Sequence, residues 1–114
     1  MIEQVEAATK DGLLVEQDVG DYKGVASNAR VFSIARAHDN VVLAVWTGDY
    51  NFASVLVKND KNKWVPISFN PALTEHYRLS ERKANGLCWR KDIDDTIFAA
   101  WFITNLETIR SIGR

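Results

Sequence analysis

Cysteine is almost absent from the sequence, since Cys88 is the only one in 114 residues. A single thiol cannot form an intrachain disulfide and cannot supply a cysteine-based zinc site. Because disulfides belong to oxidising compartments, we expect a reducing, cytoplasmic setting. The first residues, MIEQVEAATKDG, are acidic and lack the basic and apolar regions of a signal peptide, which agrees with that expectation.

Long apolar runs and glycine-rich motifs are absent as well. No stretch reaches the roughly 20 apolar residues that a membrane-spanning helix requires. The glycines are isolated and form neither the phosphate-binding nor the dinucleotide-binding pattern, which disfavours nucleotide binding through a backbone cradle. No repeat, linker or low-complexity tract divides the chain, so we expect a single globular domain over residues 1–114.

Neither sign of charge is in large excess, because the formal net charge is −1. This balance disfavours a general binder of nucleic acids or membrane surfaces. The charge is nevertheless graded along the chain. Residues 1–57 carry eight acids and four bases, whereas residues 58–114 carry seven acids and ten bases. Hydrophobic residues make up 46% of the chain, which is ample for a buried core.

Runs rich in β-branched and aromatic residues dominate the first two-thirds of the chain. They predict strands within residues 13–19, 30–37, 41–47, 52–58 and 64–69. In the first of these runs, alternate residues from Leu13 to Val19 share one face. The turns between the later runs are too short for the crossover that parallel neighbours need, so we expect an antiparallel meander. Pro66 has no N–H to donate to a ladder, which places the last strand at an edge or a bulge.

Helical periodicity appears at both ends of the chain. Apolar spacing predicts a short helix over residues 2–10. The strongest pattern predicts a second helix that starts at Asp94 or Asp95 and ends at Gly113. Its apolar face comprises Ile97, Phe98, Trp101, Phe102, Leu106, Ile109 and Ile112. The predicted fold class is therefore α+β, with a short N-terminal helix, a four- to five-stranded antiparallel meander, and one or two C-terminal helices packed on one face.

Residues 71–85 are compatible with a helix or a hairpin. Asn70 is a good N-cap, and Pro71 suits the first position of a helix. The pair Asn85-Gly86 fits either the end of that helix or the tip of a hairpin. The stretch SERKA has little β-propensity, so the helix is favoured and the hairpin stays open.

No group of side chains fixes a reaction. Cys88 and His76 are the one candidate nucleophile–base pair. A cysteine between Leu87 and Trp89 is more typical of a small buried hydrophobe, however. His38 and His76 lack the spacing of metal ligands on one helix face. We therefore predict no catalytic residue, no metal site and no cofactor.

Positive charge is concentrated near a tryptophan in the second half of the chain. On a helix Arg78 and Arg82 would lie one turn apart, and Lys83, Trp89 and Arg90 follow closely. Such a basic cluster can be a solvated face, can contact an acidic protein, or can bind nucleic acid through charge and stacking. Acidic residues interrupt the cluster, so an acidic protein partner is favoured over nucleic acid.

Some aromatic and polar residues fall in unexpected positions. Trp64 on the predicted edge strand and Tyr50 in a predicted loop are large rings that are hard to bury, and such rings carry binding energy at interfaces. Asn105 falls amid the apolar face of the C-terminal helix. It either bonds a backbone carbonyl or lies in a pocket or subunit interface near Tyr77 and Trp101.

These observations favour a non-catalytic protein-binding module, such as an inhibitor, an immunity-type protein or an accessory protein of bacterial or phage origin. One alternative is a small-molecule-binding domain or enzyme with a pocket between the sheet and the C-terminal helix. Another is nucleic-acid binding through the basic patch at residues 78–91. The expected partner is a protein with an acidic surface. No membrane contact is expected, and a homodimer stays open.

Overall fold

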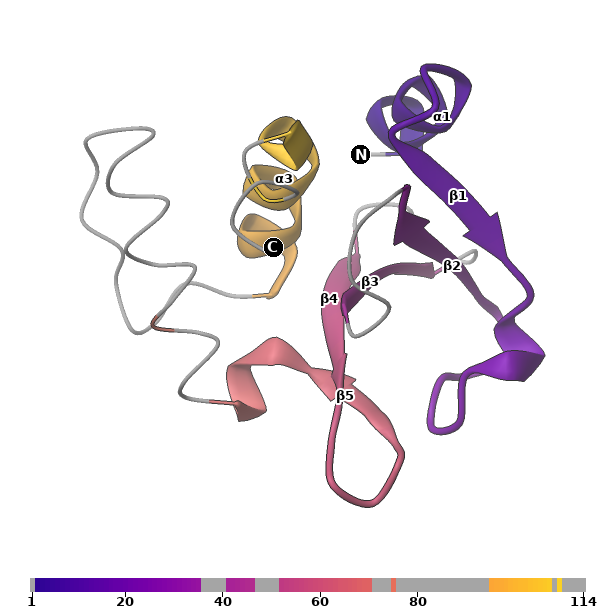
Figure 1. Cartoon of the computed structure of the whole chain (residues 1–114), viewed down its shortest axis with the longest axis vertical. Coiled ribbons are helices and arrows are strands. Elements are labelled where there is room, and N and C mark those ends of the chain that lie inside the picture. Colours follow the sequence, from indigo (N-terminus) through magenta and orange to yellow (C-terminus); the bar gives the residue numbers. More distant parts are fainter. Residues whose placement is uncertain are drawn as a thin grey trace.

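A computed structural model describes residues 2–35, 41–46, 52–70, 75, 95–107 and 109. Its elements are α1 (Ile2–Lys10), β1 (Leu14–Gln17), the 3₁₀ turn η1 (Val19–Asp21), β2 (Ala29–Ile34), β3 (Val41–Trp46), β4 (Ala53–Lys58), β5 (Trp64–Pro66), the 3₁₀ turn η2 (Ile67–Phe69) and α3 (Asp95–Thr104). The strands form one sheet, and the two helices lie against the same face of it (Figure 1). The predicted α+β class is confirmed.

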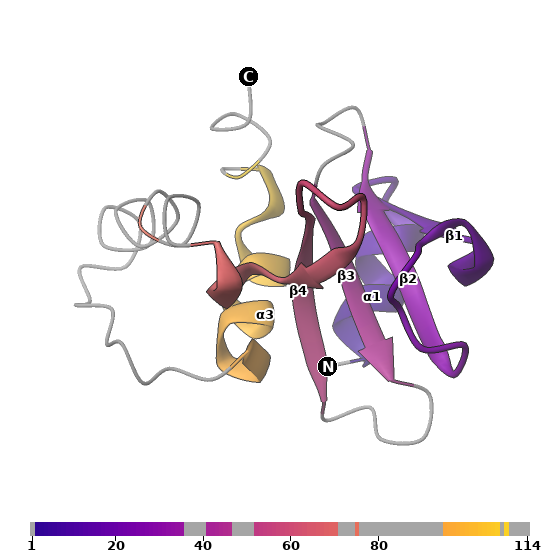
Figure 2. The same ribbon diagram turned by 90° about the horizontal axis from the view of Figure 1, so that it is seen from below.

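The sheet is the predicted antiparallel meander, in the order β1-β2-β3-β4-β5. Figure 2 shows the strands lying side by side from β4 to β1, with α3 beside β4. Pro66 ends β5 at the edge of the sheet, opposite Leu56 of β4, as its missing N–H predicts. The remainder of the predicted strand at 64–69 is the turn η2. The predicted turns at 38–40 and 47–51, and the helix or hairpin at 71–85, lie outside the described residues.

Both helices pack on one face of the sheet. Phe32, Leu43 and Val55, from β2, β3 and β4, are fully buried against Val5 of α1 and Phe102 of α3. Alternate residues of each strand point to this face, so the three central strands contribute their side chains to one core. The predicted packing of helices on one face is confirmed.

The second face is covered by the connection between β1 and β2. The buried residues of this face are Val31, Val42, Ala44, Leu56 and Trp64, and the partly buried residues packed against them are Val19, Tyr22, Val25 and Trp46. This connection is therefore a covering layer of the sheet. It explains why β3 is apolar at every position, because a strand buried on both faces does not alternate.

The first strand differs from its prediction. β1 is shorter than residues 13–19, and its buried residue is Leu14, at 1% exposure, whereas Val15 is 45% exposed. The Leu13 N–H donates to the Ala8 carbonyl at 2.9 Å and ends α1. That contact turns the following residue, Leu14, towards the helix-covered face.

The C-terminal helix is interrupted where the prediction made it continuous. α3 ends at Thr104, a turn follows at Asn105, and helical backbone resumes at Leu106. The Thr104 hydroxyl and the Asn105 amide each donate to the carbonyl four residues earlier, both at 2.9 Å. Side-chain bonds of this kind compete with the helix ladder and bend or end a helix. The predicted end at Gly113 lies outside the described residues.

The buried face of α3 is also rotated from the predicted one. Ile97 is 55% exposed and Trp101 is only partly buried, while Ala99 and Ile103 belong to the core. The centre of the face is Phe102. α3 packs against β4, and Ala99 is fully buried in the core that the two elements share. Ile97, which the sequence pattern places on the apolar face, does not belong to the buried core.

Candidate functional site

Most residues predicted to contact a partner lie outside the described part of the chain. These are Tyr50, Arg78, Arg82, Lys83, Trp89 and Arg90. The same holds for Tyr77, His38, His76 and Cys88. Three of the predicted residues, Trp64, Trp101 and Asn105, lie in the described part. Trp64 belongs to one buried cluster, whereas Trp101 packs against the other and its carbonyl accepts from the Asn105 side chain, so the structure does not bring Trp64 together with the other two.

Trp64 is buried, at 8% exposure, which contradicts the expectation that an edge-strand tryptophan would be hard to cover. The Tyr22 ring packs on it with centroids 5.1 Å apart. The backbone N–H of Trp64 donates to the Lys23 carbonyl at 2.9 Å. Gly24 has φ +97° and passes so close that a Cβ there would lie 3.2 Å from the Trp64 carbonyl oxygen. Trp64 therefore holds the covering loop through its backbone and through the contact of its ring with Tyr22, and the indole offers little surface to a partner.

The docking of this loop brings four lysines to one corner of the sheet. Lys58, Lys61 and Lys63 belong to the β4–β5 hairpin, and Lys23 belongs to the loop bonded to it. All four are exposed, and within the described residues none forms an ion pair. Asp60 is the one acid of the hairpin turn. We call the four residues the lysine corner.

The turn that carries three of these lysines is held by its own hydrogen bonds. The Asn59 side-chain oxygen accepts from the N–H groups of Lys61 at 3.0 Å and Lys63 at 2.9 Å. The Asn59 N–H donates to the Lys63 carbonyl at 2.8 Å. Asn62 has φ +64°, in the left-handed region that asparagine tolerates. The backbone positions of the lysines are therefore fixed, although their side chains are free to move in water.

Large apolar side chains are exposed at a few places on the described surface. They are Val15 and Phe52 at 45%, Ile97 at 55% and Phe69 at 74%. Phe69 is the last residue of η2, whose Ile67 is buried at 2% exposure. The Asn70 N–H closes the turn on the Ile67 carbonyl at 2.8 Å. The turn is thus anchored in the core while the Phe69 ring lies in water.

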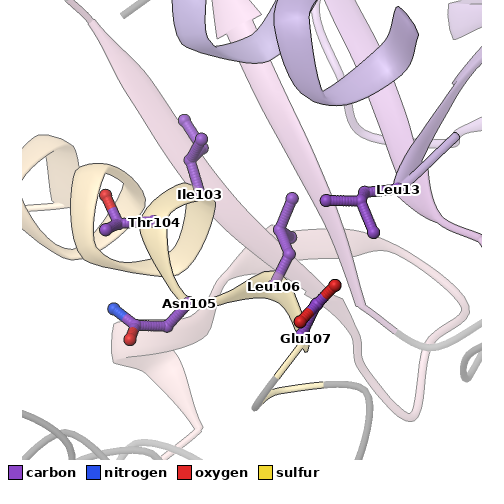
Figure 3. A pocket seen from close by; sticks show the side chains of 6 residues that line it. All are labelled: Leu13, Ile103, Thr104, Asn105, Leu106 and Glu107. Atoms are coloured by element: carbon purple, nitrogen blue, oxygen red, sulfur yellow. The ribbon is translucent and has the colours of Figure 1, made fainter. Parts of the chain in front are cut away.

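A cavity of about 260 Å³ lies where α3 ends. Its walls are Leu13, Ile103, Thr104, Asn105, Leu106 and Glu107 (Figure 3). Leu13 and Leu106 point towards one another, whereas the Asn105 side chain points away from Leu13. The Asn105 amide donates to the Trp101 carbonyl at 2.9 Å. Asn105 therefore bonds a backbone carbonyl, as one alternative expected, and it also contributes to the wall of a cavity.

A cluster of three charged residues joins α1, β1 and β2. The Arg30 guanidinium donates to the two Glu16 carboxylate oxygens at 2.9 and 2.7 Å and to Glu6 at 3.5 Å, and it lies 5.2 Å from the centroid of the Phe32 ring. The hydrogen bond from Arg30 lowers the pKa of Glu16, while the carboxylates raise the pKa of Arg30. Both groups stay ionised at neutral pH. The cluster ties the helix to the sheet, and Arg30 is not an available cation.

Within ranges 2–35, 41–46, 52–70 and 95–107 and at residues 75 and 109, no group of three or more His, Cys, Asp or Glu residues could hold a metal ion. None of the helices in this described part is long and apolar enough to cross a membrane.

The sequence patterns missed both the lysine corner and the exposed Phe69. The stretch NDKNK was interpreted only as a turn, although three lysines between 58 and 63 were a visible signal. Lys23 could not be added from sequence, because its place depends on where the covering loop docks. Phe69 was predicted to lie in a strand, and only the termination of β5 at Pro66 turns its ring outwards.

Comparisons with models of protein families, with curated proteins and with solved structures find no significant match for this chain.

Proposed function

We propose that this chain is a non-catalytic protein-binding module of the inhibitor, immunity or accessory type, and that Phe69 is a principal contact. The observation that carries the proposal is the 74% exposure of a phenyl ring on an anchored turn. Burying such a ring at an interface contributes about 1.5–3 kcal/mol. Aromatic side chains of this kind are frequent anchors at protein interfaces.

The remainder of the fold supports recognition through projecting side chains. Both faces of the sheet are already covered, one by the helices and the other by the β1–β2 connection. A partner would therefore contact turns, hairpins, helix surfaces or the edges of the sheet, and not its faces. Because η2 is held by Ile67 and by its own backbone hydrogen bond, little conformational entropy is lost when Phe69 is engaged. The single cysteine supports a reducing, cytoplasmic setting for this interaction.

The test compares the wild type with Phe69→Ala and with Phe52→Ala as a matched control. Each protein is immobilised, exposed to an extract of the native host, and its retained proteins are identified by mass spectrometry. We expect the wild type and Phe52→Ala to retain one protein in stoichiometric amount and Phe69→Ala to lose it. Thermal melts should show Phe69→Ala as stable as the wild type, because an exposed ring contributes little to folding.

Other outcomes would point to other functions. Retention of RNA or DNA in place of a protein would favour nucleic-acid binding, the activity proposed for the 78–91 patch. Retention of the same protein by Phe69→Ala at undiminished affinity would remove Phe69 from the interface.

The cavity at the end of α3 favours small-molecule binding as a second candidate. Its volume of about 260 Å³ is just below the range of roughly 300–1,000 Å³ that ligand pockets occupy. Ile103 and Leu106, two of its walls, are themselves buried in the core. Leu13→Trp would fill the cavity, so a compound that co-purifies with the wild type and is lost in this variant would establish the second function.

A further inference from the structure

The lysine corner is a concentration of positive charge at one end of the molecule. Lys58, Lys61, Lys63 and Lys23 come from two segments that the Trp64–Lys23 backbone bond holds together. α1, with its two glutamates, lies at the far end of the molecule from the β4–β5 hairpin (Figure 1). The four exposed lysines therefore form a local basic patch on the described surface. A surface of this kind steers the approach of a partner that carries the opposite charge.

The absence of paired acids at the corner leaves its charge available to a partner. Within the described residues the lysines make no ion pair, and Arg30, which does, is located on the helix-covered face. The hairpin turn is fixed by the hydrogen bonds of Asn59, so the spacing of the lysine backbones does not have to be ordered on binding. Pre-organised groups bind with a smaller entropic loss than mobile ones.

The chemistry of the corner fits protein carboxylates better than a nucleic acid. Non-specific binding of single strands combines basic groups with exposed aromatic rings on which bases stack. Here the aromatic rings are used for packing, since Trp64 is 8% exposed and Tyr22 covers it. Asp60 also lies within the basic turn, where it would repel a continuous chain of phosphates. A partner with separated carboxylates can avoid that residue.

We infer that the lysine corner binds an acidic segment of the protein partner. This inference rests on the proposed function, because it specifies the chemistry of the partner that Phe69 helps to hold. The carboxylates of that segment pair with the lysine ammonium groups at the hairpin and the docked loop. Such contacts at the rim of an interface act mainly on the association rate and its salt dependence.

The direct test uses a fluorescent oligoglutamate peptide and an oligothymidylate of similar charge, both at low ionic strength. We expect oligoglutamate to bind, with amide shifts in nuclear magnetic resonance spectra confined to residues 21–24 and 58–64. Lys61→Gln/Lys63→Gln should weaken this binding by roughly three- to thirtyfold. Lys10→Glu, on exposed α1, lowers the net charge by the same amount at a distant place, and it should change the affinity by less than about twofold.

Several results would overturn the inference. One is that oligoglutamate does not bind, and another is that it shifts amides outside residues 21–24 and 58–64. A third is that Lys10→Glu weakens the binding as much as Lys61→Gln/Lys63→Gln does, which would indicate only an effect of net charge. Tighter binding of oligothymidylate at the same lysines would assign the corner to nucleic acid. A protein partner that needs Phe69 but associates with Lys61→Gln/Lys63→Gln at an unchanged rate would refute this inference and leave the proposed function standing. A wild type that retains no protein would overturn both.

Discussion

Ser54 lies in the middle of β4, opposite Ala44 of β3, and is 1% exposed. Its hydroxyl has no hydrogen-bond partner among the described residues. This burial is not predictable from the sequence pattern, because a serine between apolar residues in ASVLV is typical of a strand position that faces solvent. Ser54 pairs with Ala44, which belongs to the buried cluster on the second face of the sheet. Burial on the second face could not be predicted residue by residue.

Replacing Ser54 tests the cost of that hydroxyl. A buried polar group that gives up water without gaining a partner costs about 1–3 kcal/mol, so Ser54→Ala should raise the free energy of unfolding by roughly 1 kcal/mol. Ser33→Ala is the matched control on the same face, since the Ser33 hydroxyl accepts from Gln17 at 3.0 Å and donates to the Val15 carbonyl at 3.4 Å. The control should be neutral or destabilising in urea denaturation. Equal losses in both variants would mean that Ser54 is satisfied.

At the scale of the element, α3 separates what a helical pattern can predict from what it cannot. The sequence predicts the helix and a start at Asp94 or Asp95, and α3 begins at Asp95. Which face of α3 is buried cannot be predicted in the same way. A helical wheel treats all apolar residues alike and contains no information on how closely the helix backbone approaches the sheet. Ala99, fully buried against the sheet, was overlooked for that reason. The break at Asn105 was equally hidden, since it depends on two side-chain bonds to the helix carbonyls.

Two substitutions in α3 distinguish the observed face from the predicted one. Phe102→Ala removes a fully buried ring and should cost about 3–5 kcal/mol. Ile97→Ala removes a side chain that is 55% exposed and should change stability by no more than about 0.5 kcal/mol. The measurement is chemical denaturation of both variants. If both variants lose a comparable free energy of unfolding, Ile97 is buried as the apolar pattern of the sequence predicts, and the observed packing of α3 is contradicted.

At the scale of the whole molecule, the β1–β2 connection joins parts of the sheet that are far apart in strand order. β1 and β5 are the two edges, yet the loop that leaves β1 reaches Trp64 in β5. The order of the strands was predictable from short turns between apolar runs. The docking of the loop was not, because its glycines and small polar residues show only that it is irregular. The arrangement of the lysine corner depends on this docking.

Gly24 is the position at which the docking can be tested. A Cβ there would meet the Trp64 carbonyl oxygen at 3.2 Å and would also have to adopt φ +97°. Gly12 is the matched control, because it has φ +77° but nothing within 4 Å of an added Cβ. Both alanine variants acquire the backbone strain of about 1–3 kcal/mol, and only Gly24→Ala adds a steric conflict with β5. We therefore expect Gly24→Ala to be the less stable of the two.

The local readout separates loop detachment from general loss of stability. Since the Trp64 N–H is bonded to the loop at Lys23, detachment should accelerate its hydrogen exchange in Gly24→Ala and leave it protected in Gly12→Ala. The loop also carries Lys23, so the same variant should weaken oligoglutamate binding while retaining all four lysines. If Gly24→Ala and Gly12→Ala lose equal stability and the Trp64 amide stays protected, then the contact between loop and β5 does not close the second face.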